Sequence, residues 1–461
     1  MKDAKEKQKK QNRRVTAFAL VMGVAVVAVI LALLLPQVIA ADRTAVVIDG
    51  KKYGLCEYNY YYQTYYDTYC SENEQYLPYM FDTSKSLKTQ AYDENQSWFD
   101  YFTDQAVESM TGVIAVADAA RGAGFALPAA DQAEIDTALS NVASSALNRN
   151  MTSDAYLSGI YGKGMTAELF REHLTNVKLA KAYGESVKKN FAFTDAELQK
   201  QYEQNPGKYA LVDYERFYVK AAEPGKKPAA AEEAAAKATA DEILSRVQAG
   251  ESLKDVSADY ADKGTYASFG AAYYDKSFSY GAWLFSPDRK TGDSAEIDDG
   301  SGWYVMVFHE ADRGQYSAAC GVDAAFAADG SAEDAKQQYE DACEKAETLR
   351  SAWLAGDGTA ESAAKAAEQA GAETQSFTDL TKNTLDGNIE SWLFDPARKP
   401  GESAVLYTET GFHAVLYTGP GRAAWRVLAE KDLREAKYGA WYDALLKGTK
   451  AERREAVLKT A

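Results

Sequence analysis

Histidine and cysteine are scarce in this chain of 461 residues, which contains three histidines and four cysteines. His173, His309 and His413 lie far apart, and no HExxH or nucleophile-elbow motif surrounds any of them. The cysteines form no CxxC pair and no cluster with histidine, which argues against a zinc site. The sequence therefore predicts neither a bound metal nor a cofactor.

The four cysteines differ in whether a disulfide can join them. Cys56 and Cys70 fall on one predicted helix, where fourteen residues span about 21 Å, so they cannot pair if that helix is continuous. Cys320 and Cys343 can pair if the chain is exported, because disulfides form in oxidising compartments. Their spacing leaves that pairing open.

Basic residues are outnumbered, since 51 lysines and arginines stand against 68 acidic residues and give a net charge of −17. Seven of the basic residues lie within the first fourteen positions, so the remaining chain is more negative still and repels nucleic acid. Hydrophobic residues make up 46% and aromatic residues 12% of the chain. This composition excludes a disordered protein and can form cores for two to four domains.

Charge is absent from residues 15–41, which are dominated by Val, Leu, Ile, Ala and Met. A run of this length can cross a hydrocarbon core about 30 Å thick as a helix. We therefore expect a transmembrane helix, with residues 1–14 in the cytoplasm and everything after Asp42 outside. The alternative is a secretion signal cleaved after Ala40, but the apolar run is longer than such signals usually have. The expected location is the cell membrane, with the bulk of the chain extracytoplasmic.

Residues 280–308 recur as residues 389–417, at a spacing of 109 positions without a gap. Ten of the twenty-nine positions are identical, including the run Trp-Leu-Phe-x-Pro-x-Arg-Lys-x-Gly that begins at Trp283 and at Trp392. A period this long indicates two copies of one domain, because solenoid repeats are about 20 to 50 residues long. Each copy reads as an apolar patch, a turn at Pro and Gly, and a β-hairpin.

Upstream of the repeat, residues 44–54 read as two short strands joined by an Asp-Gly turn, and the chain then becomes helical. The first helix places several tyrosines on one face, among them Tyr62 and Tyr66. In one interpretation this face packs against neighbouring helices. In the other, Tyr62 and Tyr66 line a groove that binds unfolded polypeptide, because tyrosine offers a rigid apolar ring with a polar edge.

Two motifs close the helical region: SDAYLSGIYGKGMT at residues 153–166 and TDAELQKQYEQNPGKY at residues 194–209. With the opening strand pair and the long helices, they resemble the N-terminal chaperone region of the SurA and PrsA class of exported foldases. The tandem repeat fits that class, whose chaperone region is followed by one or two parvulin-type peptidylprolyl isomerase domains. The resemblance implies that unfolded or newly exported polypeptides are the partners of this chain.

A parvulin site has a histidine on its first strand, an acid or cysteine after its second helix, an apolar proline pocket and a histidine on its last strand. In the first copy the resemblance aligns these positions with Phe217, Asp262 and Tyr304, so both histidines are absent. The expected pocket residues are aromatic: Phe278, Tyr280 and Phe285. Asp262 and Tyr304 are therefore the candidate catalytic residues, Phe217 and the pocket are the candidate substrate-binding residues, and any activity is expected to be weak.

The second copy departs from the parvulin pattern at other positions. His413 matches the histidine of the last strand, but Phe326 takes the first position and residues 370–371, Ala-Gly, take the acidic one. Ile389 stands where the first copy has Tyr280. His413 is a candidate substrate-binding residue, with a structural role as the alternative, and we expect isomerase activity to reside in the first copy.

These observations predict an α+β chain with an N-terminal transmembrane helix, an all-α chaperone module completed by the C-terminal helix, and two parvulin-like domains in tandem. The expected boundaries are 1–14 for a basic cytoplasmic tail, 15–41 for the transmembrane helix, 42–211 for the chaperone domain, 212–315 and 316–421 for the two parvulin-like domains, and 422–461 for a helical segment that packs on the chaperone domain.

The expected function is that of a membrane-anchored, extracytoplasmic folding factor, a peptidylprolyl isomerase and chaperone for exported proteins. The alternative is a non-catalytic chaperone or an envelope scaffold with degenerate isomerase domains. The sequence names neither the client proteins nor the oligomeric state.

Overall fold

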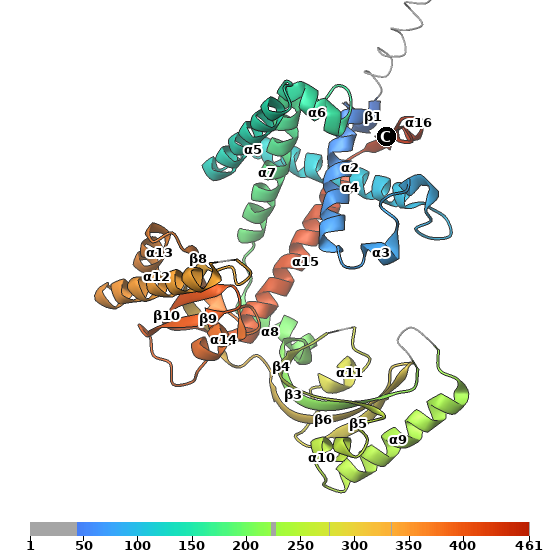
Figure 1. The fold of residues 1–461 in the computed structure, drawn as a ribbon, viewed down its shortest axis with the longest axis vertical. Coiled ribbons are helices and arrows are strands. Elements are labelled where there is room, and N and C mark those ends of the chain that lie inside the picture. Colours follow the sequence, from blue (N-terminus) through green and yellow to red (C-terminus); the bar gives the residue numbers. More distant parts are fainter. Residues whose placement is uncertain (1–43, 223–226, 276, 333, 461) are drawn as a thin grey trace, which may run out of the picture. The chain divides into compact units, whose positions relative to one another are not determined.

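The chain folds into helices and three antiparallel sheets in a computed structural model that describes residues 44–222, 227–275, 277–332 and 334–460 (Figure 1). These residues fall into two units. One unit joins the two ends of the chain, up to Ala192 and from Glu435 onward, and the other comprises Phe193–Arg434. The predicted tail at 1–14 and the predicted transmembrane helix at 15–41 lie outside the described residues.

A small sheet opens the first unit. Its strands β1 (Thr44–Ile48) and β2 (Lys51–Gly54) are joined by Asp49 and Gly50, whose φ angles are 46° and 84°. Positive φ at both positions is what a two-residue type I′ turn needs, and Asp-Gly is a preferred pair for it. Strand β11 (Ala451–Arg453), from near the C-terminus, pairs with the other edge of β1.

The helices of the first unit are α2 (Leu55–Glu72), α3 (Leu77–Met80), the 3-10 helix η1 (Leu87–Thr89), α4 (Trp98–Gly122), α5 (Ala129–Asn148), α6 (Ser153–Tyr161), α7 (Ala167–Lys189), the C-terminal part of α15 (Ala424–Gly448) and α16 (Glu455–Leu458). Side-chain caps start two of the long helices. The hydroxyl of Ser97 accepts a hydrogen bond from the backbone N–H of Asp100 at α4, and Thr166 caps α7 in the same way. Such caps satisfy backbone donors that the helix itself leaves unpaired.

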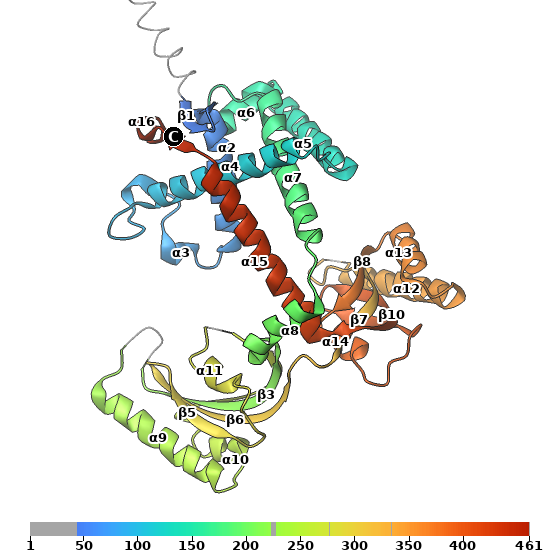
Figure 2. The ribbon, with the colours of Figure 1, turned by 180° about the vertical axis from the view of Figure 1, so that it is seen from behind.

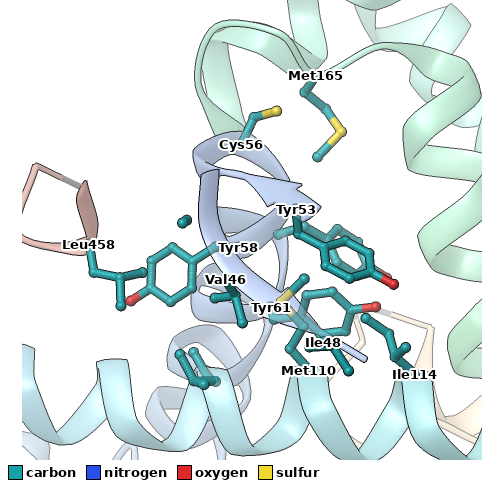
Figure 3. Close-up of a cluster of buried hydrophobic side chains, with 14 of the residues drawn as sticks. Val46, Ile48, Tyr53, Cys56, Tyr58, Tyr61, Met110, Ile114, Met165 and Leu458 are labelled. Carbon is teal, nitrogen blue, oxygen red and sulfur yellow. The ribbon is translucent and has the colours of Figure 1, made fainter. Parts of the chain in front are cut away.

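The core of the first unit lies between the hairpin and helices α2 and α4 (Figure 3). Ile48, Tyr58 and Met110 are buried there, and Leu458 of α16 is 0% exposed among them. Burying a leucine side chain contributes about 1.5–3 kcal/mol. The C-terminal residues are therefore part of this core, both through β11 and through Leu458.

The predicted fold class is wrong. The chaperone module is not all-α, because β11, β1 and β2 form a sheet within it. Strand β11 has the sequence Ala-Glu-Arg, and every residue in it is exposed. It is a strand only because it pairs with β1, and its sequence has no apolar pattern from which a strand could be predicted. In addition, none of the helices found in the described part of the chain is long and apolar enough to span a membrane. The predicted location at the membrane is not tested and stays a prediction.

The second unit contains two four-stranded sheets of the same order. The first is preceded by α8 (Asp195–Gln204) and η2 (Pro206–Tyr209) and has the order β4-β3-β6-β5. Its elements are β3 (Leu211–Lys220), α9 (Ala230–Gln248), α10 (Leu253–Ala258), β4 (Gly264–Tyr273), α11 (Gly281–Leu284), β5 (Ser294–Asp298) and β6 (Gly302–Asp312).

The second sheet has the order β8-β7-β10-β9 and leads into α15. Its elements are β7 (Ser317–Ala327), α12 (Ala335–Ala355), α13 (Ala360–Gln369), β8 (Glu373–Leu380), α14 (Gly387–Leu393), β9 (Ser403–Thr408) and β10 (Gly411–Ala423). The domain boundaries predicted from the sequence stay predictions. All four cysteines of the chain are free thiols in this structure.

Two helices cover one face of each sheet (Figures 1 and 2). In the first sheet, Phe217 and Val219 of β3 pack with Val305 of β6 against α9 and α10. In the second, Ala324 and Leu416 belong to the corresponding core with α12 and α13. Because successive side chains of a strand point to opposite faces, the residues between these positions lie on the other face. We call it the open face, although α11 in the first sheet and α14 in the second cover part of it.

The repeated motif forms the same turn in both copies. The guanidinium of Arg289 lies 5.0 Å from the ring centroid of Trp283, and Gly292 follows with a φ of 87°. That left-handed φ favours glycine, which has no Cβ. The second copy repeats both features, with 4.0 Å between Arg398 and Trp392 and a φ of 90° at Gly401. The identities therefore maintain a turn and do not by themselves indicate a catalytic site.

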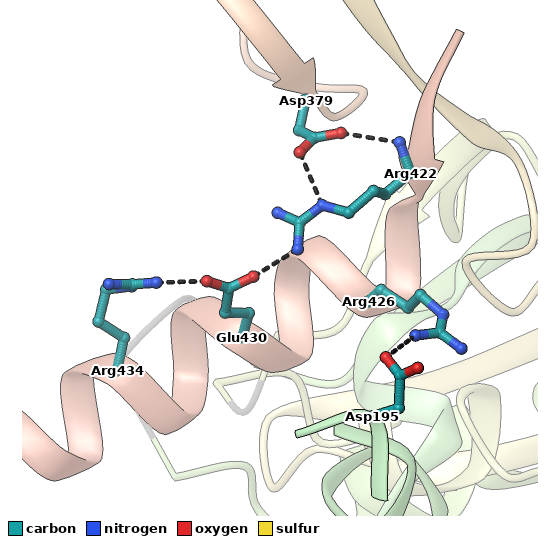
Figure 4. A network of polar contacts seen from close by, with 6 residues as sticks. All are labelled: Asp195, Asp379, Arg422, Arg426, Glu430 and Arg434. Atoms are coloured by element: carbon teal, nitrogen blue, oxygen red, sulfur yellow. Dashed lines mark hydrogen bonds and ion pairs between the residues drawn. The ribbon is translucent and has the colours of Figure 1, made fainter. Parts of the chain in front are cut away.

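A series of ion pairs fixes the start of α15 to its neighbours in the second unit (Figure 4). Nε of Arg422 donates to Asp379 at 2.8 Å, and the same guanidinium pairs with Glu430, which also pairs with Arg434. Burial alone would raise the pKa of Glu430, but the two arginines together hold it below its ordinary value. The charged end of the second sheet is thus joined to the helix that follows it.

Candidate functional site

The open face of the first sheet presents aromatic side chains around one arginine. Tyr214, Arg216 and Tyr218 alternate along β3 with the residues that face α9 and α10, so they lie on this open face. Tyr304 of β6 stands directly opposite Tyr218, with their ring centroids 4.6 Å apart. Phe269 of β4 stands opposite Tyr214. The face is therefore built from three neighbouring strands.

Arg216 lies among three of these rings. Its guanidinium carbon is 4.9 Å from the ring centroid of Phe269, 5.7 Å from that of Tyr280 and 5.3 Å from that of Tyr304. Its Nη1 donates a hydrogen bond of 2.7 Å to the Tyr280 hydroxyl. Each ring face attracts the cation through its quadrupole. We call Arg216 with Phe269, Tyr280 and Tyr304 the arginine cage.

Further aromatic contacts make the cage rigid. The hydroxyls of Tyr214 and Tyr280 are 3.2 Å apart, and the Tyr214 ring is stacked on Phe269 at 4.7 Å. Phe278 is stacked on Tyr280 at 4.9 Å and is 40% exposed, whereas Tyr280 is 1% exposed. Burial raises the pKa of Tyr304, although nearby Arg216 opposes this. The Tyr304 hydroxyl is thus a neutral hydrogen-bond donor throughout the physiological pH range.

The corresponding position of the second sheet holds an acid and a histidine. Nδ1 of His413 lies 2.9 Å and 3.1 Å from the two carboxylate oxygens of Asp323, on neighbouring strands. Asp323 stands directly opposite Val415, which belongs with Phe377 and Ile389 to the apolar cluster on the open face. The carboxylate holds the proton of the imidazole on Nδ1, so Nε2 of a neutral His413 is the acceptor nitrogen.

The strand register shows that these two groups are equivalent. Arg216 stands opposite Met306, and Asp323 stands opposite Val415, which is 109 positions after Met306. Tyr304 likewise becomes His413. The pair Arg216 and Tyr304 of one sheet thus occupies the place of Asp323 and His413 in the other, with opposite charge on the first strand.

Two of the residues predicted for the first copy lie away from the cage. Asp262 is exposed at the edge of the sheet, where it lines a cavity of about 540 Å³ with Glu232 and Thr239 of α9. Phe217 is 1% exposed and belongs to the core under α9 and α10. Neither residue shares the open face with Tyr304. A catalytic role for Asp262 and a substrate-binding role for Phe217 are not tested and stay predictions.

The other predicted residues of the first copy are brought together. Tyr280 and Tyr304 belong to the cage, and Phe278 extends it toward solvent. Phe285 is 5% exposed and lies beside the cage in the apolar cluster of the open face. In the second copy, Phe326 is equivalent to Val219, because Phe412 pairs with Phe326 as Trp303 pairs with Val219.

Tyr62 and Tyr66 lie in an aromatic cluster of the first unit. Both rings pack near the fully buried Phe102, with ring centroids 6.3 Å and 5.2 Å away. Tyr62 also contacts Phe99, and Tyr66 contacts Phe81. Both tyrosines are partly exposed. The structure thus assigns them packing contacts, and their predicted role in substrate binding is untested.

Sequence reasoning missed Arg216 and Asp323 on the open faces, and Asp299 in the turn between β5 and β6. Asp299 accepts a hydrogen bond of 3.2 Å from the Tyr218 hydroxyl. The signal for Arg216 was present in the alternation of β3, where Phe217 and Val219 mark the buried face. Asp323 gave a weaker signal, because the residues next to it along the strand are small or aliphatic: Gly321, Val322, Ala324 and Ala325.

The remaining histidines lie apart from these faces. His173 is 0% exposed, 3.2 Å from the Tyr61 hydroxyl, and His309 lies 3.4 Å from Glu215 near the end of β6. Across the described ranges there is no group of three or more side chains that could hold a metal ion.

Comparison with known proteins gives limited similarity. No protein-family model and no curated protein sequence matches this chain. One similar solved structure comes from work on SurA-like chaperones of Campylobacter jejuni, with 14% identity, 59% of this chain and 82% of the other covered, and a TM-score of 0.18. Another is PrsA from Bacillus subtilis, with 13% identity, 66% and 98% covered, and a TM-score of 0.16. These are the classes that the sequence resembles, but TM-scores this low assign no family, so function rests on the residues themselves.

Proposed function

We propose that this chain is a protein-folding factor that binds unfolded polypeptide on the open faces of its two sheets. The observation that carries this proposal is the aromatic face around Arg216, where Phe278 is 40% exposed beside rings that are already fixed by stacking. Rigid aromatic surface lets a protein gain apolar contact without ordering its own side chains. In the second sheet Val415 and Phe377 are themselves buried, and the partly exposed apolar side chains beside them provide another such surface: Trp392, Phe394 and Leu406.

The finer form of the proposal is prolyl isomerase activity. Rotation about the prolyl bond is slow because the amide must lose its resonance, with a barrier of about 18–20 kcal/mol. A protein lowers that barrier without covalent chemistry by seating the proline ring on apolar side chains and stabilising the twisted carbonyl. The Tyr304 hydroxyl in the first sheet and Nε2 of His413 in the second are groups that a bound peptide can reach on these faces. Neither sheet combines them with a second histidine, so we expect weak catalysis.

A non-catalytic chaperone is the second candidate. Arg216 favours this candidate. Three rings and a tyrosine hydroxyl hold its guanidinium in place, and such a fixed cation suits the binding of a polypeptide better than the rotation of its prolyl bond. Both candidates share the binding of unfolded chain. They differ in whether the cis and trans forms exchange faster on the protein.

Two assays on the purified protein separate these candidates. The first measures isomerisation of a proline tetrapeptide, and the second measures the aggregation of an unfolded client. Phe278→Ala should weaken client protection, because it removes exposed apolar surface. Leu354→Ala is the matched control, since Leu354 is 60% exposed on α12 away from either open face. Failure of the wild-type protein in both assays would reject the proposed function.

A further inference from the structure

The arginine cage leaves its cation without an anionic partner. Among the described residues, Arg216 makes one side-chain hydrogen bond, to the Tyr280 hydroxyl, and no ion pair. A guanidinium has five N–H donors in a planar fork, and it remains charged at every pH a protein meets. Arg216 is only partly exposed, so water compensates its charge incompletely.

The carboxylates near β3 are engaged elsewhere. Asp213 accepts a hydrogen bond of 2.7 Å from the backbone N–H of Ala271, and Asp299 accepts from Tyr218. Glu215 lies on the opposite face, where it accepts from the Tyr266 hydroxyl at 2.5 Å. None of these acids pairs with Arg216. The positive charge is therefore available to a group that comes from outside the chain.

Packing alone does not explain an arginine at this position. An apolar side chain would fill the space between the rings without the cost of removing a charge from water. The second sheet shows that this position does not require an arginine. Asp323 stands at the same register there and is paired with His413. The charge at this place differs in sign between the two open faces.

We propose that the arginine cage binds the side-chain carboxylate of an aspartate or glutamate in an extended, unfolded segment. The carboxylate accepts paired hydrogen bonds from the unused edge of the guanidinium, a geometry that arginine favours. An apolar neighbour in the same segment rests on Phe278, which is exposed beside the cage. This inference rests on the proposed function and adds a substrate class to it, namely acidic-apolar segments.

The charge of the rest of the chain makes such a site selective. A net charge of −17 repels acidic polypeptides at long range. A local cation held between aromatic rings restores attraction at one point of the surface, and its partial burial weakens screening by salt. Acidic segments are therefore recognised at the cage and not along the surface in general.

The test compares peptides on the full-length protein by fluorescence anisotropy. Two labelled peptides, acetylated and amidated, are identical except that one has Glu and the other Gln beside an apolar residue. We expect the wild-type protein to bind the Glu peptide about tenfold more tightly, as a charge-assisted hydrogen bond allows. Arg216→Gln should bind both peptides equally. Arg149→Gln is the matched control, since Arg149 is an exposed arginine over the ring of Tyr156 in the other unit and should keep the preference.

Each other outcome has a definite meaning. Equal affinity of the wild-type protein for the two peptides overturns the inference but not the proposed function, and this comparison needs no variant to fold. A Gln peptide with a free C-terminus that binds as tightly as the Glu peptide overturns the assignment to a side chain and identifies the chain end as the ligand. Binding of neither peptide rejects the proposed function. If Arg216→Gln is unfolded by circular dichroism, Arg216→Lys replaces it and should lose most of the preference, because lysine lacks the planar fork.

Discussion

Nδ1 of His413 and Oδ1 of Asp323 lie 2.9 Å apart on neighbouring strands of the second sheet. In the first sheet the same two places hold Tyr304 and Arg216, with the guanidinium 5.3 Å from the tyrosine ring. The second sheet thus has a charge-assisted hydrogen bond where the first sheet has a cation–π contact. The strand order of the two sheets is the same. The two open faces therefore have different chemistry on one scaffold.

The pair in the second sheet should contribute to stability. Asp323 is 7% exposed, so removal of its partner leaves a nearly buried carboxylate with one hydrogen bond fewer. We expect a coupling free energy of about 1–3 kcal/mol in a double-mutant cycle of Asp323→Ala and His413→Ala. Urea unfolding of the wild-type protein, both single variants and the double variant measures it. Additive effects of the two substitutions would show that the contact contributes nothing.

The C-terminal residues should be needed for the first unit to fold. Leu458 is 0% exposed in its core, so Leu458→Ala should lower the free energy of unfolding by about 2–4 kcal/mol. Leu147→Ala is the control, because Leu147 is 74% exposed on α5 and its loss should change stability by less than about 0.5 kcal/mol. Thermal unfolding followed by circular dichroism compares them. Equal stability of the two variants would exclude α16 from the core.

The aromatic cluster of the first unit predicts a loss of stability in alkaline solution. Burial raises the pKa of Tyr66 to about 12, with a further contribution from Cys70, and burial also raises the pKa of Tyr62. The folded state holds these phenolic protons more tightly than the unfolded state, whose tyrosines titrate near pH 10. Their contribution is complete below pH 10 and decreases as the pH rises from about 10 toward about 12.

A variant that keeps the rings tests this pH dependence. The double substitution Tyr62→Phe and Tyr66→Phe removes both titrating hydroxyls and should flatten the decline of the urea midpoint between pH 9 and pH 11. Phenolate absorbance measured in parallel reports how many tyrosines have ionised, and the difference between the two proteins gives the contribution of Tyr62 and Tyr66. A decline as steep as that of the wild-type protein would show that other groups cause it.

Much of the fold could be predicted from local patterns. The Asp49-Gly50 turn, the helices of the first unit and the duplicated hairpins follow from turn chemistry and periodicity. The β11 strand could not be predicted, because its three exposed residues carry no pattern and depend on the free edge of β1. The pairing of β11 with β1, two segments far apart in the chain, therefore could not be predicted from the sequence.

The candidate site was harder to predict because a strand shift of one residue exchanges its faces. The repeat aligns at 109 positions near Trp283, but Arg216 and Asp323 are 107 positions apart, since the second copy is longer between its first strand and that motif. The sequence resemblance selected Phe217 and Phe326, which are 109 positions apart, and passed over Arg216 and Asp323. Only the strand register identifies the residues that share a face.

The two candidate catalytic residues of the first sheet lie in different places. Tyr304 belongs to the arginine cage, whereas Asp262 lies at the sheet edge beside α9. If the Tyr304 hydroxyl stabilises the twisted carbonyl, Tyr304→Phe should lower kcat/KM for a proline tetrapeptide about tenfold, equivalent to one hydrogen bond made in the transition state. Asp262→Asn should cause a smaller loss, because its carboxylate does not share the open face. A loss confined to Asp262→Asn would instead assign the reaction to the cavity beside α9. An inactive wild-type protein that still protects its client would favour the non-catalytic chaperone.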